Sequence, residues 1–174
     1  GERTPPAAGD APGRRGLDAA AWGWGTATPA YQMWKDVFEA FAEPTLVAPR
    51  QEGREYDVEE HDGTLFIHTN DTHTNFRLCT ARIDAPGEWI ERIAPSPHFY
   101  MTGVTTFADF FIVEGREDGL DQIELHRYDG SAPLRLPFPE ASYVASLGDN
   151  PEYAMDVLRI GYESMVTPGT VYDY

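Results

Sequence analysis

A pattern of strand-forming residues recurs about every 45 residues along this chain, and it limits the possible folds more than any other feature. Isoleucine returns at Ile67, Ile112 and Ile160, in steps of 45 and 48 residues. Two further series keep similar steps: Leu78, Ile123 and Val171, and Val58, Val104 and Val144. A period of roughly 40–50 residues with about four strands per unit is typical of β-propeller blades. An all-β sandwich of short strands is the alternative, but it would not require this agreement in phase.

The predicted strands are runs of β-branched and aromatic residues separated by turn residues. They span residues 54–60, 64–70, 75–83, 88–93, 99–107, 109–117, 120–128, 133–138, 142–148, 157–164 and 170–174. Asp62-Gly63, Asp118-Gly119 and Asp129-Gly130 indicate tight hairpins, because Asp and Gly tolerate the positive φ angles that such loops require. The fold class is therefore all-β.

These runs make two full blades and most of a third. Propellers close with typically 4–8 blades, so three blades would leave sheet edges exposed. Either the chain pairs with other copies, or it is part of a longer protein. The last segment, SMVTPGTVYDY at 164–174, favours the second interpretation, because it turns and begins a new strand at the end of the chain.

The middle blade provides most of the predicted core. We expect it to be held by the burial of Val104, Phe111, Ile112, Ile123 and Leu125. We expect packing between neighbouring blades from Phe107, Phe110 and Phe111.

The first 33 residues differ from the rest and are predicted to be a flexible leader. Gly, Pro and Ala fill 18 of the first 30 positions, a composition that buries too little apolar surface to offset the entropy of ordering. Residues 31–43 have apolar residues at helical spacing, which predicts a short amphipathic helix, with an altered strand pair as the alternative. The propeller part is then 34–174.

The net charge is −16, from 29 acidic and 13 basic residues. Such a charge repels nucleic acids and anionic membranes and attracts basic peptides, although it also simply promotes solubility. We therefore expect no nucleic-acid and no membrane partner. No apolar run approaches the ~20 residues of a membrane span, and no apolar stretch follows Arg14-Arg15, so we expect no secretory signal. Cys79 is the only cysteine, which fits a reducing, cytoplasmic location.

No catalytic motif is present in the sequence. The segment GYESM at 161–165 places Ser164 one position late for G-x-S-x-G and lacks the second glycine, so a structural role is expected. Phosphate-loop, H-E-x-x-H and EF-hand patterns are also absent from the sequence. We predict no catalytic residue and no cofactor, and the pattern does not identify substrate-binding residues.

The histidines raise the question of a metal site. His61, His68 and His73, with Asp62 and Asp71 nearby, are separated by 7 and 5 residues. No zinc-ligand spacing has this form. We expect surface or turn histidines, and no metal.

An acidic strand face is predicted in residues 55–59. Strand alternation places Glu55, Asp57 and Glu59 on one face and Tyr56 and Val58 on the other. Such a face could line a propeller channel and attract cationic peptides, or it could be no more than a solvated surface.

Several segments together resemble one known family. Residues 48–70, 75–83, 107–128 and 146–174 are similar to the propeller domain of the prolyl oligopeptidase family, most of all to its oligopeptidase B members. The resemblance covers about residues 42–174 and is most specific in LRIGYESMVTPGTVYDY at 158–174.

The resemblance implies a two-domain serine peptidase. In this family a seven-bladed propeller covers an α/β-hydrolase domain that carries the Ser, Asp and His triad, and it admits short peptides. Members similar to oligopeptidase B cleave after Arg or Lys. By this comparison residues 34–174 are the C-terminal part of the propeller, the partner is the hydrolase domain of the same parent, and no triad residue lies in this chain.

Two other hypotheses remain. The chain could be a stand-alone interaction module whose three blades oligomerise into a closed ring, or a truncated gene product without selected function. A stable dimer or larger ring in solution would favour the interaction module.

Overall fold

The computed structural model describes residues 45–174, and all its regular elements are strands. The eleven strands are Tyr56–His61 (β1), Thr64–Thr69 (β2), Arg77–Arg82 (β3), Ala85–Ile93 (β4), Phe99–Thr106 (β5), Phe110–Glu117 (β6), Leu120–Arg127 (β7), Leu134–Arg135 (β8), Tyr143–Leu147 (β9), Arg159–Ser164 (β10) and Thr170–Asp173 (β11). Each falls within or overlaps a predicted run, so the all-β prediction is confirmed. The leader predicted for residues 1–33 and the helix predicted for 31–43 lie outside the described residues.

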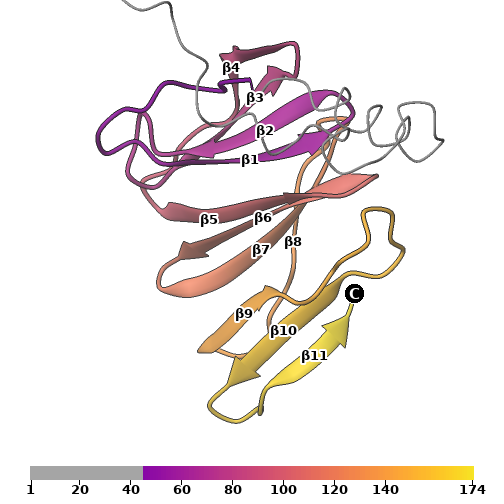
Figure 1. Ribbon diagram of the computed structural model, residues 1–174. Coiled ribbons are helices and arrows are strands. Elements are labelled where there is room, and N and C mark those ends of the chain that lie inside the picture. Colours follow the sequence, from indigo (N-terminus) through magenta and orange to yellow (C-terminus); the bar gives the residue numbers. More distant parts are fainter. Residues whose placement is uncertain (1–44) are drawn as a thin grey trace, which may run out of the picture. The chain divides into compact units, whose positions relative to one another are not determined.

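The strands form three antiparallel sheets in which every strand pairs with its neighbour in sequence (Figure 1). The first blade is β1–β4, the second is β5–β8, and the third consists of β9–β11. This is the division into two four-stranded blades and most of a third that the repeat predicts. No helix in the described part of the chain has the length and apolar character required to cross a bilayer.

Two of the three predicted tight hairpins form as expected. Asp62 and Gly63 have φ angles of 46° and 74°, and Asp118 and Gly119 have φ angles of 51° and 82°. Asp and Gly accept these angles with little strain. The third hairpin also forms, since β7 pairs with β8 and Gly130 has a φ of 79°, but its loop is longer than a tight turn because β8 starts only at Leu134.

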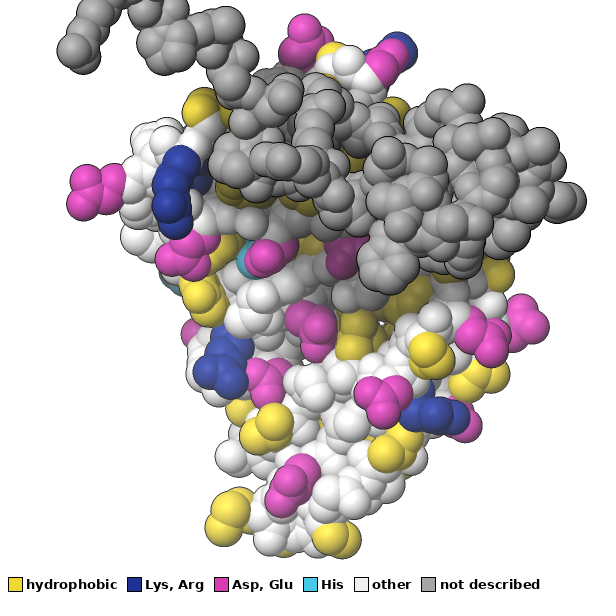
Figure 2. Space-filling view, in the orientation of Figure 1, with side chains coloured by type: hydrophobic (Ala, Val, Ile, Leu, Met, Phe, Trp, Pro, Cys, Tyr) yellow, Lys and Arg dark blue, Asp and Glu magenta, His cyan; other side chains and the backbone are white. Residues whose placement is uncertain are grey.

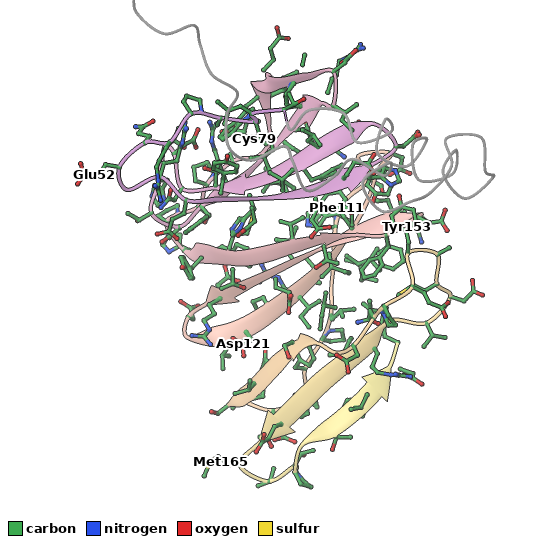
Figure 3. All side chains as sticks on the ribbon, in the orientation of Figure 1. Glu52, Cys79, Phe111, Asp121, Tyr153 and Met165 are labelled. Atoms are coloured by element: carbon green, nitrogen blue, oxygen red, sulfur yellow. The ribbon has the colours of Figure 1, made fainter. Side chains whose placement is uncertain are left out.

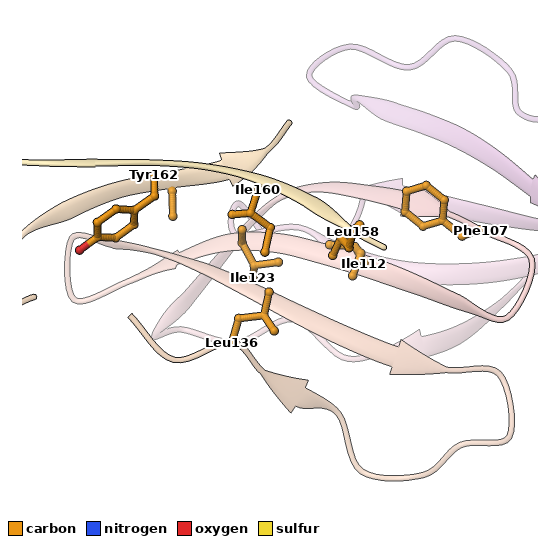
Figure 4. Close-up of a cluster of buried hydrophobic side chains, with 8 residues drawn as sticks. Phe107, Ile112, Ile123, Leu136, Leu158, Ile160 and Tyr162 are labelled. Carbon is orange, nitrogen blue, oxygen red and sulfur yellow. The ribbon is translucent and has the colours of Figure 1, made fainter. Parts of the chain in front are cut away.

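The blades pack face to face through two apolar layers, here called the first and second seams. The first seam joins the first and second blades and contains Phe66, Leu78, Met101, Phe111 and Val113. The second seam joins the second and third blades and contains Phe107, Ile112, Ile123, Leu136, Ala145, Leu158, Ile160 and Tyr162 (Figure 4). The second blade is therefore apolar on both faces, as a blade between two neighbours must be.

The predicted core of the middle blade is largely confirmed. Phe111, Ile112 and Ile123 are fully buried, whereas Val104 and Leu125 are partly buried at the margins of the two seams. The predicted phenylalanines do pack between blades. Phe107 and Phe110 belong to the second seam and Phe111 to the first.

The isoleucine series does not keep one face of the sheet. Ile67 lies on the side of the first blade away from the second, with Leu65 and Cys79. Ile160 likewise faces the blade that precedes it, but Ile112 faces the blade that follows it.

Loop length explains this difference between the blades. Seven residues separate β2 from β3, whereas two separate β6 from β7. A loop with an odd number of residues and a loop with an even number shift the pairing of their strands by one residue relative to each other. A shift of one residue moves a side chain to the other face of the sheet. The leucine series escapes the slip: Leu78 and Ile123 both face the following blade. Val144 departs from Val58 and Val104 in the same way, because it pairs with Glu163 on the outer face of the third blade.

Candidate functional site

The first strand of each blade is the part of the molecule most suited to meet a ligand. In a propeller these strands surround the central channel, and here they are β1, β5 and β9. Direct bonds link the first two: the Thr106 hydroxyl of β5 donates to the carbonyl of Glu60 in β1 at 3.0 Å. The exposed side chains of β1, β5 and β9 are called the inner surface below.

The acidic face predicted for β1 is present on this inner surface. Asp57 pairs with His68 and Glu59 pairs with Phe66, so both carboxylates lie on the face that looks toward the second blade. The Asp57 side chain is 90% exposed. On the other face Val58 is 37% exposed. The alternation is therefore as predicted for Asp57, Val58 and Glu59, whereas Glu55 precedes the start of β1 and is not part of the strand face. The strand offers negative charge to solvent.

A second candidate feature lies where the inner strands end. His61, the last residue of β1, stacks on the ring of Tyr128 with 3.6 Å between ring centroids. Its Nδ1 is 2.5 Å from the Tyr153 hydroxyl, which reaches across from the β9–β10 loop. The Tyr153 carbonyl also accepts a hydrogen bond from the Ala108 N–H at 2.9 Å. Residues from all three blades thus meet at one point, the His61–Tyr153 cluster.

The electrostatics of the His61–Tyr153 cluster are negative. Partial desolvation and the nearby charges of Glu60, Asp62 and Asp109 raise the pKa of the Tyr153 hydroxyl. The same hydroxyl therefore stays protonated and can donate to His61. Carboxylates beside aromatic rings attract guanidinium and ammonium groups, but no nucleophile with a neighbouring base is present in this cluster.

Acidic side chains are not confined to this cluster. Figure 2 shows Asp and Glu spread over the face from the first blade to the third. Figure 3 shows Tyr153 and Asp121 at opposite ends of the blades. Asp121, on β7, binds the guanidinium of Arg116 at 2.8 Å, so part of the negative charge is neutralised within the blades.

The residues considered as metal ligands are dispersed. His61 belongs to the cluster just described, and the Nδ1 of His73 accepts the N–H of Asn75 in a loop. Asp71 forms a two-pronged ion pair with Arg77. Within residues 45–174 no three His, Cys, Asp or Glu side chains come together in a metal-binding arrangement.

His68 corrects the prediction of surface or turn histidines. It is 5% exposed and lies in the first seam, where its Nε2–H donates to the Met101 carbonyl at 3.2 Å. Burial lowers the pKa of His68, and this effect is partly offset by the Met101 carbonyl and the Asp57 carboxylate. Its neighbours in β2 are Ile67 and Thr69, and all three are buried, so the polar residue lies in a strand that is buried on both faces.

Ser164 and Cys79 both lie in environments that give them structural roles. Ser164 Oγ accepts the N–H groups of Val166 and Thr167, which shapes the turn before β11. Cys79 is fully buried, and burial raises the pKa of its thiol. A thiol of this kind is unreactive.

Comparison with known proteins identifies the fold and the family. The sequence profile of the "Prolyl oligopeptidase, N-terminal beta-propeller domain" matches residues 30–174. This chain belongs to the prolyl oligopeptidase family. The blades described above are propeller blades of this family, as the sequence resemblance predicts.

Relatives within the prolyl oligopeptidase family are longer proteins. Dipeptidyl aminopeptidase BI of Pseudoxanthomonas mexicana is 33% identical over 132 residues, which cover 74% of this chain and 18% of the relative. Protease 2 of Moraxella lacunata is 29% identical over 127 residues, with 73% and 18% covered. The chain therefore spans about 18% of the length of these curated relatives.

Solved structures of the prolyl oligopeptidase family agree. Oligopeptidase B from Trypanosoma brucei matches with a TM-score of 0.69 and 31% identity, covering 73% of this chain and 19% of that one. Oligopeptidase B from Leishmania major matches with a TM-score of 0.69 and 27% identity over the same shares.

The sequence did not reveal the His61–Tyr153 cluster of this propeller. Tyr153 lies in the irregular segment between β9 and β10, where no periodicity is available, and its partner is 92 residues away. Only the acidic strand residues on β1 had a local signal, which was their alternation.

Proposed function

We propose that residues 34–174 are C-terminal blades of a seven-bladed propeller that gates a serine oligopeptidase. The observation that carries this proposal is the match of three consecutive blades to a propeller domain, in a relative of which the matched stretch covers only 18%. Catalysis would come from the Ser, Asp and His of an α/β-hydrolase domain in the same parent. The role of this chain would be to admit short peptides and to pack against that domain, in the cytoplasm.

We propose further that the parent cleaves short peptides after Arg or Lys. The similarity to proteins named oligopeptidase B supports this. So do the net charge of −16 and the exposed carboxylates of Asp57 and Glu59, because negative fields raise the rate at which cationic peptides arrive.

The first experiment measures hydrolysis by the 174-residue chain alone. We expect no turnover of fluorogenic peptides that end in Arg or Lys. Turnover that a serine-directed inhibitor abolishes would contradict the absence of catalytic residues in this chain.

The second experiment tests the gating role directly. Residues 46–174 replace the matching blades of Trypanosoma brucei oligopeptidase B, and the hybrid is given a short Arg reporter and an unfolded protein. We expect cleavage of the short reporter and protection of the protein. A hybrid that a serine-directed inhibitor labels, yet that digests the protein, would contradict gating by these blades.

Charge reversal tests the preference for basic peptides. In the same hybrid, Asp57→Lys with Glu59→Lys should lower kcat/KM for the Arg reporter several-fold at low salt, and the loss should shrink at high salt. Asp149→Lys with Glu152→Lys, two exposed positions in the β9–β10 loop, is the control that makes the same change in total charge. Equal losses in both would show that net charge alone matters.

A stand-alone interaction module is the second candidate. The two seams hold three blades together without any other domain, which favours it. Its test is the molar mass in solution: a stable closed oligomer supports the module, whereas a monomer or an aggregate supports the gating proposal.

A further inference from the structure

The free edge of each inner strand is a potential docking point for extended peptides. An unpaired strand edge presents a row of N–H and C=O groups that another strand can bind. In β9 the Gly148 N–H bonds to the Arg159 carbonyl of β10. The backbone N–H groups of successive residues in a strand point alternately to its two edges. Since the Gly148 N–H points to β10, the N–H groups of Leu147 and Ala145 point to the free edge.

Carboxylates of the second blade occupy both of these N–H groups. Glu114 Oε1 accepts the Leu147 N–H at 2.9 Å. Asp121 Oδ2 accepts the Ala145 N–H at 3.1 Å. The Tyr143 hydroxyl donates to the Asp121 carbonyl at 2.9 Å, which ties the start of β9 to the same strand.

A similar arrangement occurs at the first seam, but there the side chain is the hydrogen-bond donor and the backbone edge is the acceptor. His68 of the first blade donates through Nε2 to the Met101 carbonyl of β5. The Met101 N–H donates to the Asn75 carbonyl at 3.0 Å. Both edge groups of Met101 are thus occupied by the preceding blade.

His68 and Glu114 hold the same position in the repeat. His68 pairs across the sheet with Leu78, and Glu114 pairs with Ile123. Leu78 and Ile123 are successive members of the leucine series and face the following blade. At this position the first blade has a donor, His68, which meets a carbonyl of the next blade. The second blade has an acceptor, Glu114, which meets an N–H of the next blade.

We propose that this repeat position is an edge clasp, a side chain that closes the free backbone edge of the next blade. The clasp fixes the inner strand of that blade at one register. It also removes the backbone groups that a passing peptide would need for strand addition. In the third blade the position paired with Val171 is Gly161, which has no side chain, so the clasp series stops there.

Amide hydrogen exchange of the 174-residue chain tests the clasp. In Glu114→Ala we expect the Leu147 amide to exchange about tenfold faster, because a charge-assisted bond is lost. Glu114→Gln should be intermediate, since its amide oxygen still accepts. The Gly148 amide, bonded within its own blade, should not change. Glu163→Ala, on the exposed face of β10, is the control.

The exchange experiment has three outcomes, and each one either supports or overturns the clasp. Faster exchange at Leu147 alone supports the clasp. An unchanged Leu147 amide overturns it, and so does equal acceleration at Leu147 and Gly148, which would mean that the blade merely unfolds. If Glu114→Ala does not fold, the conservative Glu114→Gln carries the test by the same criterion.

A peptide probe tests the closed edge. The probe is Ac-TVTVTV-amide, with a copy N-methylated at alternate residues as control, because methylation removes the hydrogen-bonding N–H. We expect the probe to shift the Ala145 and Leu147 amide signals of Glu114→Ala/Asp121→Ala but not those of the unmodified chain. Shifts in the unmodified chain, no shifts in the variant, or equal shifts from the methylated copy would overturn the proposal.

Discussion

The ring of Phe99 in β5 lies directly against the backbone of Gly115 in β6. A methyl group on Gly115 would lie 2.6 and 2.8 Å from the Cε1 and Cε2 atoms of that ring, and closer still to Cζ. Phe99 packs at the first seam, where the Arg135 guanidinium lies 5.9 Å from its ring centroid. An aromatic ring that covers a glycine in the neighbouring strand is a known device for filling the gap that glycine leaves.

This contact predicts that Gly115→Ala destabilises the protein by about 1–3 kcal/mol, the usual cost of overpacking. Urea unfolding measures the change. Gly103→Ala is the matched control, because Gly103 has open space around its Cα. In Phe99→Ala/Gly115→Ala the losses should be less than additive. Additive losses would mean that the two residues are not in contact.

Buried His68 predicts a loss of stability in mild acid. Its pKa in the folded protein lies below 6.5 because of burial, so the unfolded chain binds the proton more tightly. The stability that depends on neutral His68 is complete above about pH 6.5 and declines as the pH falls toward the lowered pKa. Urea unfolding at pH 7.5 and 5.5 should show this decline, and His68→Gln should reduce it. His73→Gln should leave the decline intact. If His68→Gln has the same pH dependence as the parent chain, the prediction is wrong.

The Arg77 ion pairs predict a difference between shielded and exposed charges. Arg77 binds Asp71 through two bonds of 2.8 Å and Glu91 through one of 2.9 Å, and the Arg77 and Asp71 side chains are 17% and 18% exposed. Arg77→Met should cost about 1–3 kcal/mol. Arg82→Met should cost almost nothing, because Arg82 and Asp84 are 78% and 62% exposed. Equal costs would contradict the role of shielding.

The same ion pair predicts an acid limb in the stability curve. The hydrogen bond from Arg77 lowers the pKa of Asp71 below its ordinary value of 3.8. The folded carboxylate therefore stabilises the protein above about pH 3.8, and that contribution is lost as the pH falls through the lowered pKa. The stability difference between the parent chain and Arg77→Met should narrow over this range. A constant difference would show that the carboxylate is not the group involved.

The Tyr153 hydroxyl predicts a link between the first and third blades. Tyr153→Phe removes its contact with His61 and should lower the free energy of unfolding by about 1 kcal/mol. His61→Ala/Tyr153→Phe should cost less than the sum of the two single changes. Tyr172→Phe is the control, since its hydroxyl forms no hydrogen bond within residues 45–174. A full sum in the double variant would show that the bond contributes nothing in solution.

The strands and their grouping into blades could be predicted from the sequence, because each blade consists of strands that are consecutive in sequence. Strand residues alternate within a few positions, and Asp-Gly pairs mark the turns at Gly63 and Gly119. Within residues 45–174 the last blade has three strands, which agrees with the prediction of most of a third blade. The repeat spacing does not show which face of the sheet a residue such as Ile112 occupies, because that depends on whether the loop between the strands has an odd or an even number of residues.

The polar details were equally out of reach. His68 was predicted to be a surface or turn histidine because its spacing from His61 and His73 matches no metal site. Only the packing of β5 shows that its Nε2 binds the Met101 carbonyl. Tyr153 and its partner His61 lie 92 positions apart, and no local pattern connects them. Residues that act across seams are fixed by tertiary packing.

Within each blade every strand pairs with the strand next to it in sequence, and this affects how the chain folds. Every ladder joins strands that are consecutive in sequence, through connections of two to eleven residues, so each blade can form from local contacts. Stability is then close to a sum of terms within blades and terms between adjacent blades, as in other repeat proteins. Folding can begin in any blade and propagate along the chain. Destabilising substitutions in the third blade should therefore leave the first blade folded.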